Sequence, residues 1–220
     1  KTFTMGAMIA QVLRQRIDAR ILLLATTNIA VDQAIIAVDA AFDLLERAGA
    51  SVDRPRFQCV RSGARVKASL YAGREHLLPD PDEGLRAELA ELEANRPSVN
   101  SPHLVAAWKE RVKALRDRLK RRVGELAERY RLIAMTSTAA AYTLAGLREA
   151  PTFDLVVIDE ASQMGLAHAA VLAPLGRTLL CTGDPKQLAP ITHSTHPVAK
   201  KWLGRSPFDV MGSAPRVQLN

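Results

Sequence analysis

Residues 155–163 read Leu-Val-Val-Ile-Asp-Glu-Ala-Ser-Gln, an apolar run that ends in two adjacent carboxylates. A second run, residues 179–190, reads Leu-Leu-Cys-Thr-Gly-Asp-Pro-Lys-Gln-Leu-Ala-Pro. Short apolar runs of this kind are typical of strands that are buried on both faces of a parallel sheet. In open α/β sheets, ligands bind outside the carboxyl ends of the strands. The two runs therefore predict a parallel sheet whose rim carries Asp159, Glu160 and Gln187 toward a ligand.

The predicted rim has the residue types that nucleotide hydrolysis requires. In NTPases one carboxylate holds Mg²⁺ and a neighbouring group orients or deprotonates water, tasks that suit Asp159 and Glu160. Gln187, on a neighbouring strand, would reach the terminal phosphate or the attacking water. The acidic pair also fits a strand end held by an arginine, and residues 183–187 also fit a simple turn, because Gly, Asp and Pro form turns. Their occurrence together at two strand ends favours an NTPase site.

Lys1 and Thr2 stand directly before an amphipathic segment. In a phosphate-binding loop, such a lysine reaches the β- and γ-phosphates, the threonine hydroxyl meets Mg²⁺, and preceding glycines supply N–H groups. No glycines precede Lys1 here, so the pair alone is a weak signal. It becomes stronger beside the Asp159-Glu160 strand, because the two motifs would meet across one phosphate site.

Composition narrows the class of protein. The chain has 220 residues, 48% of them hydrophobic, and a formal net charge of +7, which favours a polyanionic partner, nucleic acid before membrane. Cys59 and Cys181 lie in apolar runs and are expected to be buried thiols of a reducing compartment. No apolar run approaches the roughly 18 residues of a membrane span. We therefore expect a cytoplasmic protein, or a nuclear one in a eukaryote.

Helical and strand patterns alternate at both ends of the chain, which is typical of a parallel sheet covered on both faces. The expected elements are a helix over 3–19, a strand over 21–25, a turn over 26–28, a helix whose apolar face runs from 31 to 45 and which ends at Gly49, a strand over 57–60, a basic turn over 61–63, a strand over 132–135, a helix near 138–148, a strand that ends at Asp159, a helix near 166–174, a strand that ends at Gly183, and a loop-rich segment over 192–216.

The middle of the chain interrupts this alternation. Residues 82–95 and 103–130 have apolar stripes at helical spacing, and a short Pro-containing turn joins them. Two such helices should form an antiparallel hairpin. The expected organisation is an ATPase domain over 1–64 and 131–220, with the hairpin inserted over 65–130. The excess of basic residues in the second helix suits either a solvated face with i,i+4 pairs or a nucleic-acid guide.

Four segments resemble successive motifs of the superfamily-one helicases, in the Upf-like branch that moves 5′ to 3′ on RNA or DNA: Leu22–Asp32, Ile133–Ala139, Val156–Gln163 and Leu179–Pro190. The resemblance covers nearly all of the chain except the hairpin, and the last two motifs are the most specific. It implies a RecA-like P-loop NTPase fold that uses ATP and Mg²⁺. It also implies that Lys1 and Thr2 end the Walker A loop, that Asp159 binds Mg²⁺, that Glu160 activates water, and that Gln187 couples the terminal phosphate to movement.

The same resemblance implies nucleic-acid contacts at Thr27, Asn28, Thr136 and Pro190. Short polar side chains and helix N-terminal amides hydrogen-bond phosphates without reading bases. Residues 27–28 and 136–137 also suit the caps of the helices that follow them, and both roles are compatible. The expected partner is single-stranded RNA or DNA.

The resemblance further implies that this is an interior piece of a longer ATP-dependent helicase or translocase, with little activity alone. The glycine-rich part of the loop and its strand would precede Lys1, and a second RecA-like domain with arginine fingers would follow Asn220. Two alternatives stay open. One is a non-hydrolysing nucleic-acid-binding scaffold with the same fold. The other is a different ATPase with the same site chemistry, such as a transporter or chaperone motor.

Overall fold

A five-stranded parallel sheet forms the centre of the protein. The computed structural model describes residues 1–63, 66–78, 83–97, 102–144 and 152–217. The strand order is β2-β3-β1-β4-β5, and every neighbouring pair is parallel. The strands are β1 (Ile21–Ala25), β2 (Cys59–Arg61), β3 (Leu132–Thr136), β4 (Phe153–Ile158) and β5 (Gly176–Cys181). All five residues of β1 are buried, which explains its uninterrupted apolar sequence. The α/β fold predicted from the sequence is confirmed.

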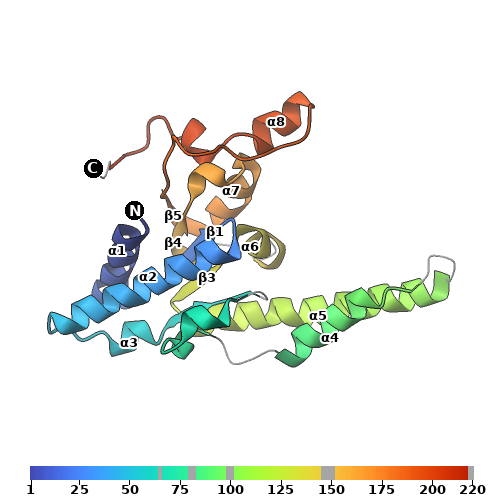
Figure 1. Ribbon diagram of the computed structural model, residues 1–220, viewed down its shortest axis with the longest axis horizontal. Helices are drawn as coiled ribbons and strands as arrows, with labels where there is room; N and C mark the ends of the chain where they lie inside the picture. The colour runs from blue at the N-terminus through green and yellow to red at the C-terminus, as the bar shows by residue number, and fades with distance from the viewer. Residues whose placement is uncertain (64–65, 79–82, 98–101, 145–151, 218–220) are drawn as a thin grey trace.

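Helices cover both faces of the sheet (Figure 1). On one face lie α1 (Thr2–Gln15) and α2 (Asn28–Arg47), and on the other lie α6 (Ser137–Thr143) and α7 (Leu166–Leu172). Successive side chains of β1 alternate between the two cores: Leu23 packs with α1 and α2, and Leu24 packs with α6 and α7. Burial of one such leucine stabilises the fold by about 1.5–3 kcal/mol.

The contact between α1 and α2 depends on Gly6. A Cβ atom at this position would lie 2.6 Å from the backbone carbonyl of Ala37, closer than two such atoms can approach. The glycine therefore lets α1 lie directly on α2. This packing helps to hold the start of α1 at the sheet.

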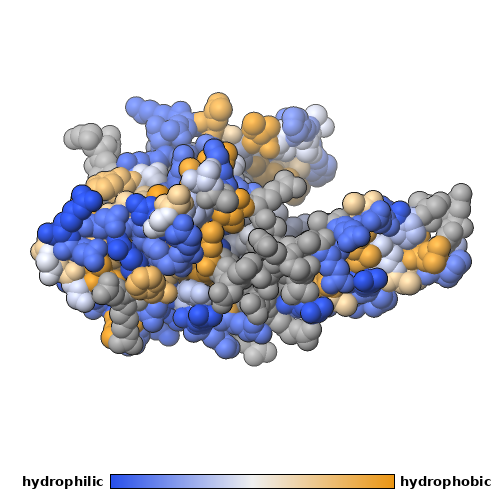
Figure 2. All heavy atoms as spheres, turned by 60° about the horizontal axis from the view of Figure 1, so that its bottom comes forward, coloured by the Kyte–Doolittle hydropathy of each residue, from blue (hydrophilic) through white to orange (hydrophobic). Residues whose placement is uncertain are grey.

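The middle of the chain forms the predicted helical hairpin. Helices α4 (Glu83–Ala94) and α5 (Pro102–Arg129) lie side by side and extend from the sheet as an arm, which is mostly hydrophilic (Figures 1 and 2). Trp108 Nε1 donates a hydrogen bond to the Leu92 carbonyl at 2.6 Å across the pair. Residues 98–101 of the predicted turn lie outside the described residues. Among the helices described, none combines the length and apolar character of a membrane span.

The segment before the arm packs with the sheet domain. It contains two 3₁₀ turns, η1 (Ala68–Tyr71) and η2 (Glu75–Leu77). The side chains of Tyr71 and Leu77 are buried in the same core as α1 and α2. The start of the insertion at residue 65 therefore stays a prediction.

Several local predictions differ from the structure. Arg61 is the buried last residue of β2, whereas the sequence suggested a basic turn. Strand β5 ends at Cys181, so Gly183 follows the strand. Helix α6 ends at Thr143, and residues 145–148 of its predicted range lie outside the described residues. The short helices α3 (Asp53–Arg56) and α8 (Pro197–Leu203), and the 3₁₀ turns η3 (Ala161–Gln163), η4 (Ala173–Leu175) and η5 (Pro207–Asp209), were not predicted, because one or two turns give too short a periodic pattern.

Both cysteines are free thiols. Cys59 is buried, and burial raises the pKa of its thiol. Cys181 is half-buried, and burial raises its pKa to about 11. Both thiols therefore stay protonated and unreactive near neutral pH.

Candidate functional site

Asp159 follows β4 directly and is 2% exposed. Its Oδ1 atom accepts hydrogen bonds from Thr182 Oγ1 at 2.7 Å and from the Glu160 backbone N–H at 3.0 Å. The Thr2 hydroxyl lies 3.5 Å from the other oxygen, Oδ2. No lysine, arginine or histidine that the structure describes forms an ion pair with Asp159. A buried carboxylate that lacks a cationic partner favours the binding of a cation.

Glu160 has a left-handed backbone, with φ 54° and ψ 39°. It is the one non-glycine residue with a positive φ in the part of the chain that the structure describes. Such a conformation costs about 1–3 kcal/mol, and strain of this kind is concentrated at functional sites. The turn directs the Glu160 carboxylate to Lys1 Nζ, 2.9 Å from Oε1, and to Gln163 Nε2, 3.2 Å from Oε2. The two adjacent carboxylates therefore have different surroundings.

Lys1 and Thr2 stand at the beginning of α1, with Lys1 as the N-cap residue. The first turn of a helix has unpaired N–H groups and the positive end of the helix dipole, both of which favour a bound phosphate. The structure thus brings Lys1 and Thr2 to Glu160 and Asp159, respectively. This juxtaposition agrees with the expected geometry, and the catalytic roles of these residues stay predictions.

Gln187 lies in an exposed turn after β5. Its backbone N–H donates to the Asp184 carbonyl at 3.0 Å, and its side chain makes no hydrogen bond with any residue that the structure describes. The role of Gln187 in the site stays a prediction. Thr182 donates a hydrogen bond to Asp159, although it was not among the site residues predicted from the sequence. The parallel register, which pairs Ile158 with Cys181, places the next residues of the two strands side by side.

Thr27 and Thr136 cap the helices that follow them at the same edge of the sheet. Thr27 Oγ1 accepts from the Ala30 N–H at 3.1 Å, and Thr136 Oγ1 accepts from the Ala139 N–H at 3.3 Å. The capping roles are confirmed, and the contacts with nucleic acid stay predictions. Asn28 is half-buried, and its Oδ1 accepts from Arg61 Nη2 at 2.9 Å.

Pro190 lines a hollow of about 380 Å³ at the carboxyl edge. Thr26 and Ser137 line it from the ends of β1 and β3, and Met164 lines it from the segment after β4. The hollow therefore connects the predicted contact at Pro190 with the capped helix starts.

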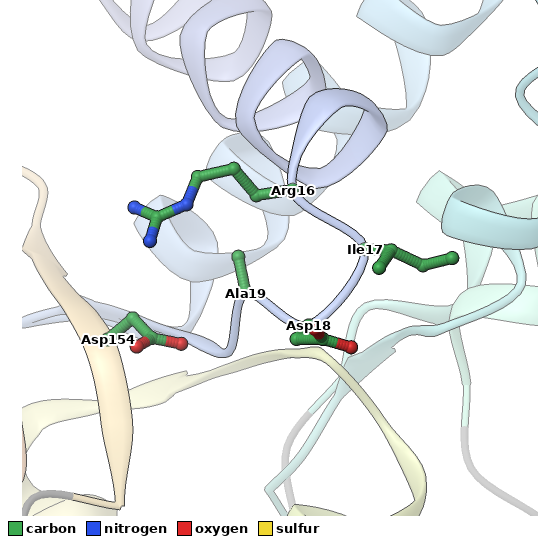
Figure 3. A pocket seen from close by; sticks show the side chains of 5 residues that line it. All are labelled: Arg16, Ile17, Asp18, Ala19 and Asp154. Atoms are coloured by element: carbon green, nitrogen blue, oxygen red, sulfur yellow. The ribbon is translucent and has the colours of Figure 1, made fainter.

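A second hollow, of about 260 Å³, lies at the opposite edge of the sheet, where β1 and β4 begin (Figure 3). It is lined by Arg16, Ile17, Asp18, Ala19 and Asp154, and none of the predicted site residues is among them. The Asp154 carboxylate accepts a hydrogen bond from the Arg20 N–H at 3.0 Å. Because ligands of open α/β sheets bind at the carboxyl ends of strands, the edge with Asp159 is the candidate site.

Comparison with known proteins identifies the family. The family model of the AAA domain matches residues 72–195, more than half of the chain. The match includes Asp159, Glu160 and Gln187, and it begins after Lys1 and Asn28. No curated protein matches the chain. Members of this P-loop class bind a nucleotide, typically with Mg²⁺. The chain belongs to the AAA domain family and is a P-loop NTPase of the helicase type.

Proposed function

We propose that the protein is an ATP-dependent motor on single-stranded nucleic acid, that is, a helicase or translocase. The observation that carries this proposal is the meeting of a lysine, a threonine and two adjacent carboxylates at the carboxyl edge of a parallel sheet (Lys1, Thr2, Asp159 and Glu160). The helix starts capped by Thr27 and Thr136 lie at the same edge. ATP hydrolysis and nucleic-acid binding would therefore take place at the same edge of the sheet.

The donor set fits Mg²⁺. This ion prefers oxygen ligands and is usually held by one or two carboxylates together with substrate phosphates. Asp159 and Thr2 would hold it, while Thr182 fixes the Asp159 carboxylate by donating to Oδ1. When bound, Mg²⁺ would neutralise charge on the β- and γ-phosphate oxygens.

Glu160 is the residue that we propose to activate water. Its side chain is 24% exposed and forms an ion pair with the Lys1 ammonium at 2.9 Å. A phosphate that binds the same ammonium would weaken this ion pair and leave the carboxylate available to accept a proton from water. Gln187, on its exposed turn, is proposed to contact the terminal phosphate and to couple its loss to movement. A second RecA-like domain is proposed to supply the arginine that stabilises the transferred phosphate.

We propose that the single-stranded nucleic acid contacts Thr27, Asn28, Thr136 and Pro190. The net charge of +7 favours a polyanion in general. The helix starts after Thr27 and Thr136 have N–H groups that suit phosphate oxygens, and the hollow beside Pro190 offers space next to them.

ATP turnover of the full-length protein, with and without a single-stranded oligonucleotide, tests the proposal. We expect the oligonucleotide to stimulate turnover, and Glu160→Gln to lower kcat by about 10²–10⁴-fold because it removes the base. Glu91→Gln, on the exposed surface of α4, removes the same charge away from the site and should leave turnover unchanged.

Three outcomes would contradict the proposal. Equal turnover in Glu160→Gln and wild type would show that Glu160 is not the catalytic base. Binding of the oligonucleotide without any hydrolysis would indicate a scaffold. Hydrolysis that does not respond to nucleic acid would indicate a motor of another kind.

A further inference from the structure

A buried network joins the start of α2 to the end of β2. Arg61, the last residue of β2, is 0% exposed. Its Nε donates to Asp32 Oδ1 at 2.7 Å, and its Nη2 donates to Asn28 Oδ1 at 2.9 Å. Asn28 and Asp32 are four residues apart on α2 and so lie on the same face of the helix. One guanidinium therefore binds both side chains.

Further contacts hold this guanidinium in place. Arg61 Nη1 donates to the Ser62 carbonyl. Tyr71 donates its hydroxyl to Asp32 Oδ1 at 2.8 Å, and burial, together with this hydrogen bond, raises the pKa of Tyr71 and keeps it a donor. The Lys67 N–H lies 3.5 Å from Asp32 Oδ2. Because Arg61 could move only by breaking a buried ion pair, its position is well defined.

The chemistry of the guanidinium sets the orientation of the Asn28 amide. Arginine has only hydrogen-bond donors, so the amide must turn its oxygen, and not its nitrogen, toward Arg61. The NH₂ group then faces away from the network. It makes no hydrogen bond with any residue in the described ranges. Because it is also not one of the fully buried polar atoms without a partner, it is accessible to solvent, next to Thr27 at the carboxyl edge of β1.

We propose that Arg61 is a positioning residue, which presents the Asn28 amide as a hydrogen-bond donor to a phosphate oxygen of the nucleic-acid strand. The inference rests on the proposed function, because it specifies the chemistry of one proposed contact. Phosphate oxygens only accept hydrogen bonds, so the opposite orientation of the amide would place two acceptors face to face. Arg61 excludes that orientation.

The first test is Asn28→Asp in the full-length protein. This variant keeps an oxygen for Arg61 and replaces the exposed NH₂ group with an anionic oxygen. We expect an unchanged or raised melting temperature and a loss of about tenfold or more in affinity for a labelled single-stranded oligonucleotide, measured by fluorescence anisotropy. Asn95→Asp, at the exposed end of α4, makes the same charge change elsewhere and should leave the affinity unchanged.

The second test is a double-mutant cycle. Arg61→Lys keeps a positive charge beside Asp32 but loses the fork that reaches both partners. We expect it to lower the affinity about three- to tenfold in the wild type and to have little further effect in an Asn28→Ala background. A merely structural role for Arg61 would lower the affinity equally in both backgrounds and would overturn the proposal.

The oligonucleotide sequence separates the possible acceptors. Equal losses on oligothymidine and on a purine-rich oligonucleotide support a phosphate oxygen, whereas a loss on one of them alone would overturn that assignment in favour of a base carbonyl. Wild-type affinity in Asn28→Asp would reject the role of the amide and leave the proposed function intact. Failure of the wild-type protein to bind either oligonucleotide would reject the proposed function itself.

Discussion

Asp32 and Asp159 are both almost fully buried, 1% and 2% exposed, and yet their surroundings differ. Asp32 forms an ion pair with Arg61 at 2.7 Å and accepts a hydrogen bond from Tyr71 at 2.8 Å. Asp159 accepts from Thr182 and a backbone N–H, without an ion pair among the described residues. A buried carboxylate with a full set of partners stabilises the fold, whereas one that lacks a cation can bind one. Burial of a carboxylate therefore does not by itself identify a site, and the partners of the carboxylate do.

The largest change in the free energy of unfolding is expected at Asp32. Asp32→Ala would leave the buried Arg61 guanidinium without its carboxylate and should lower the free energy of unfolding by about 3–5 kcal/mol. Urea denaturation followed by circular dichroism measures this loss. Asp32→Asn, which keeps an acceptor, should cost less. If Asp32→Ala costs below about 1 kcal/mol, the ion pair does not stabilise the fold as we infer.

A smaller effect on stability is expected at Asp159. In Asp159→Asn the amide oxygen still accepts from Thr182, so the free energy of unfolding should change by about 1 kcal/mol or less. Ligand binding should change more: Mg²⁺ with a nucleotide should stabilise the wild type by about 2.7 kcal/mol at a hundredfold excess over Kd and should fail to stabilise the variant to that extent. Thermal shifts with nucleotide, with and without Mg²⁺, measure both quantities. An equal Mg²⁺-dependent shift in the two proteins would argue against a metal at Asp159.

The smallest change in the free energy of unfolding is expected at Asp43. This partly exposed carboxylate on α2 forms ion pairs with Arg56 and Arg74. Burial alone would raise its pKa, but the hydrogen bonds from Arg56 and Arg74 lower it below the ordinary value of 3.8. Because the folded-state pKa is lowered, Asp43 stabilises the fold above pH 3.8, and this stabilisation is lost as pH falls through the folded pKa.

Asp43→Asn should therefore be less stable than the wild type at pH 7, and the difference should shrink as the pH falls below the ordinary value of 3.8. Urea denaturation at pH 7 and over a series of acidic pH values measures how the difference changes. A difference that does not depend on pH would show that the ion pairs of Asp43 do not contribute.

Much of the fold could be predicted from local sequence patterns. The apolar runs that became β1, β3 and β4 are short and continuous because these strands are buried on both faces. The apolar stripes at helical spacing in residues 82–95 and 103–130 predicted the pair of helices α4 and α5, since helix periodicity is a local property. Arg61 was assigned to a turn because no local rule predicts that an arginine will be buried beside an aspartate of another element.

The candidate site likewise contains residues that could be predicted from the sequence and residues that could not. Asp159 and Glu160 were found because a strand-end position can be read from an apolar run. Thr182 was missed because its role depends on the register of β4 and β5. Gln187 follows β5 in an exposed turn, and its part in the site stays a prediction.

The amino-acid sequence by itself determined where the main strands and the longer helices lie and which strand ends carry carboxylates, because both follow from the local spacing of apolar and polar residues. The tertiary structure alone decided which carboxylates acquire a cationic partner. That choice depends on side chains distant in the sequence: Asp32 meets the Arg61 guanidinium, whereas Asp159 meets only the neutral Thr182 hydroxyl, and the order and register of the strands bring each pair within hydrogen-bond distance.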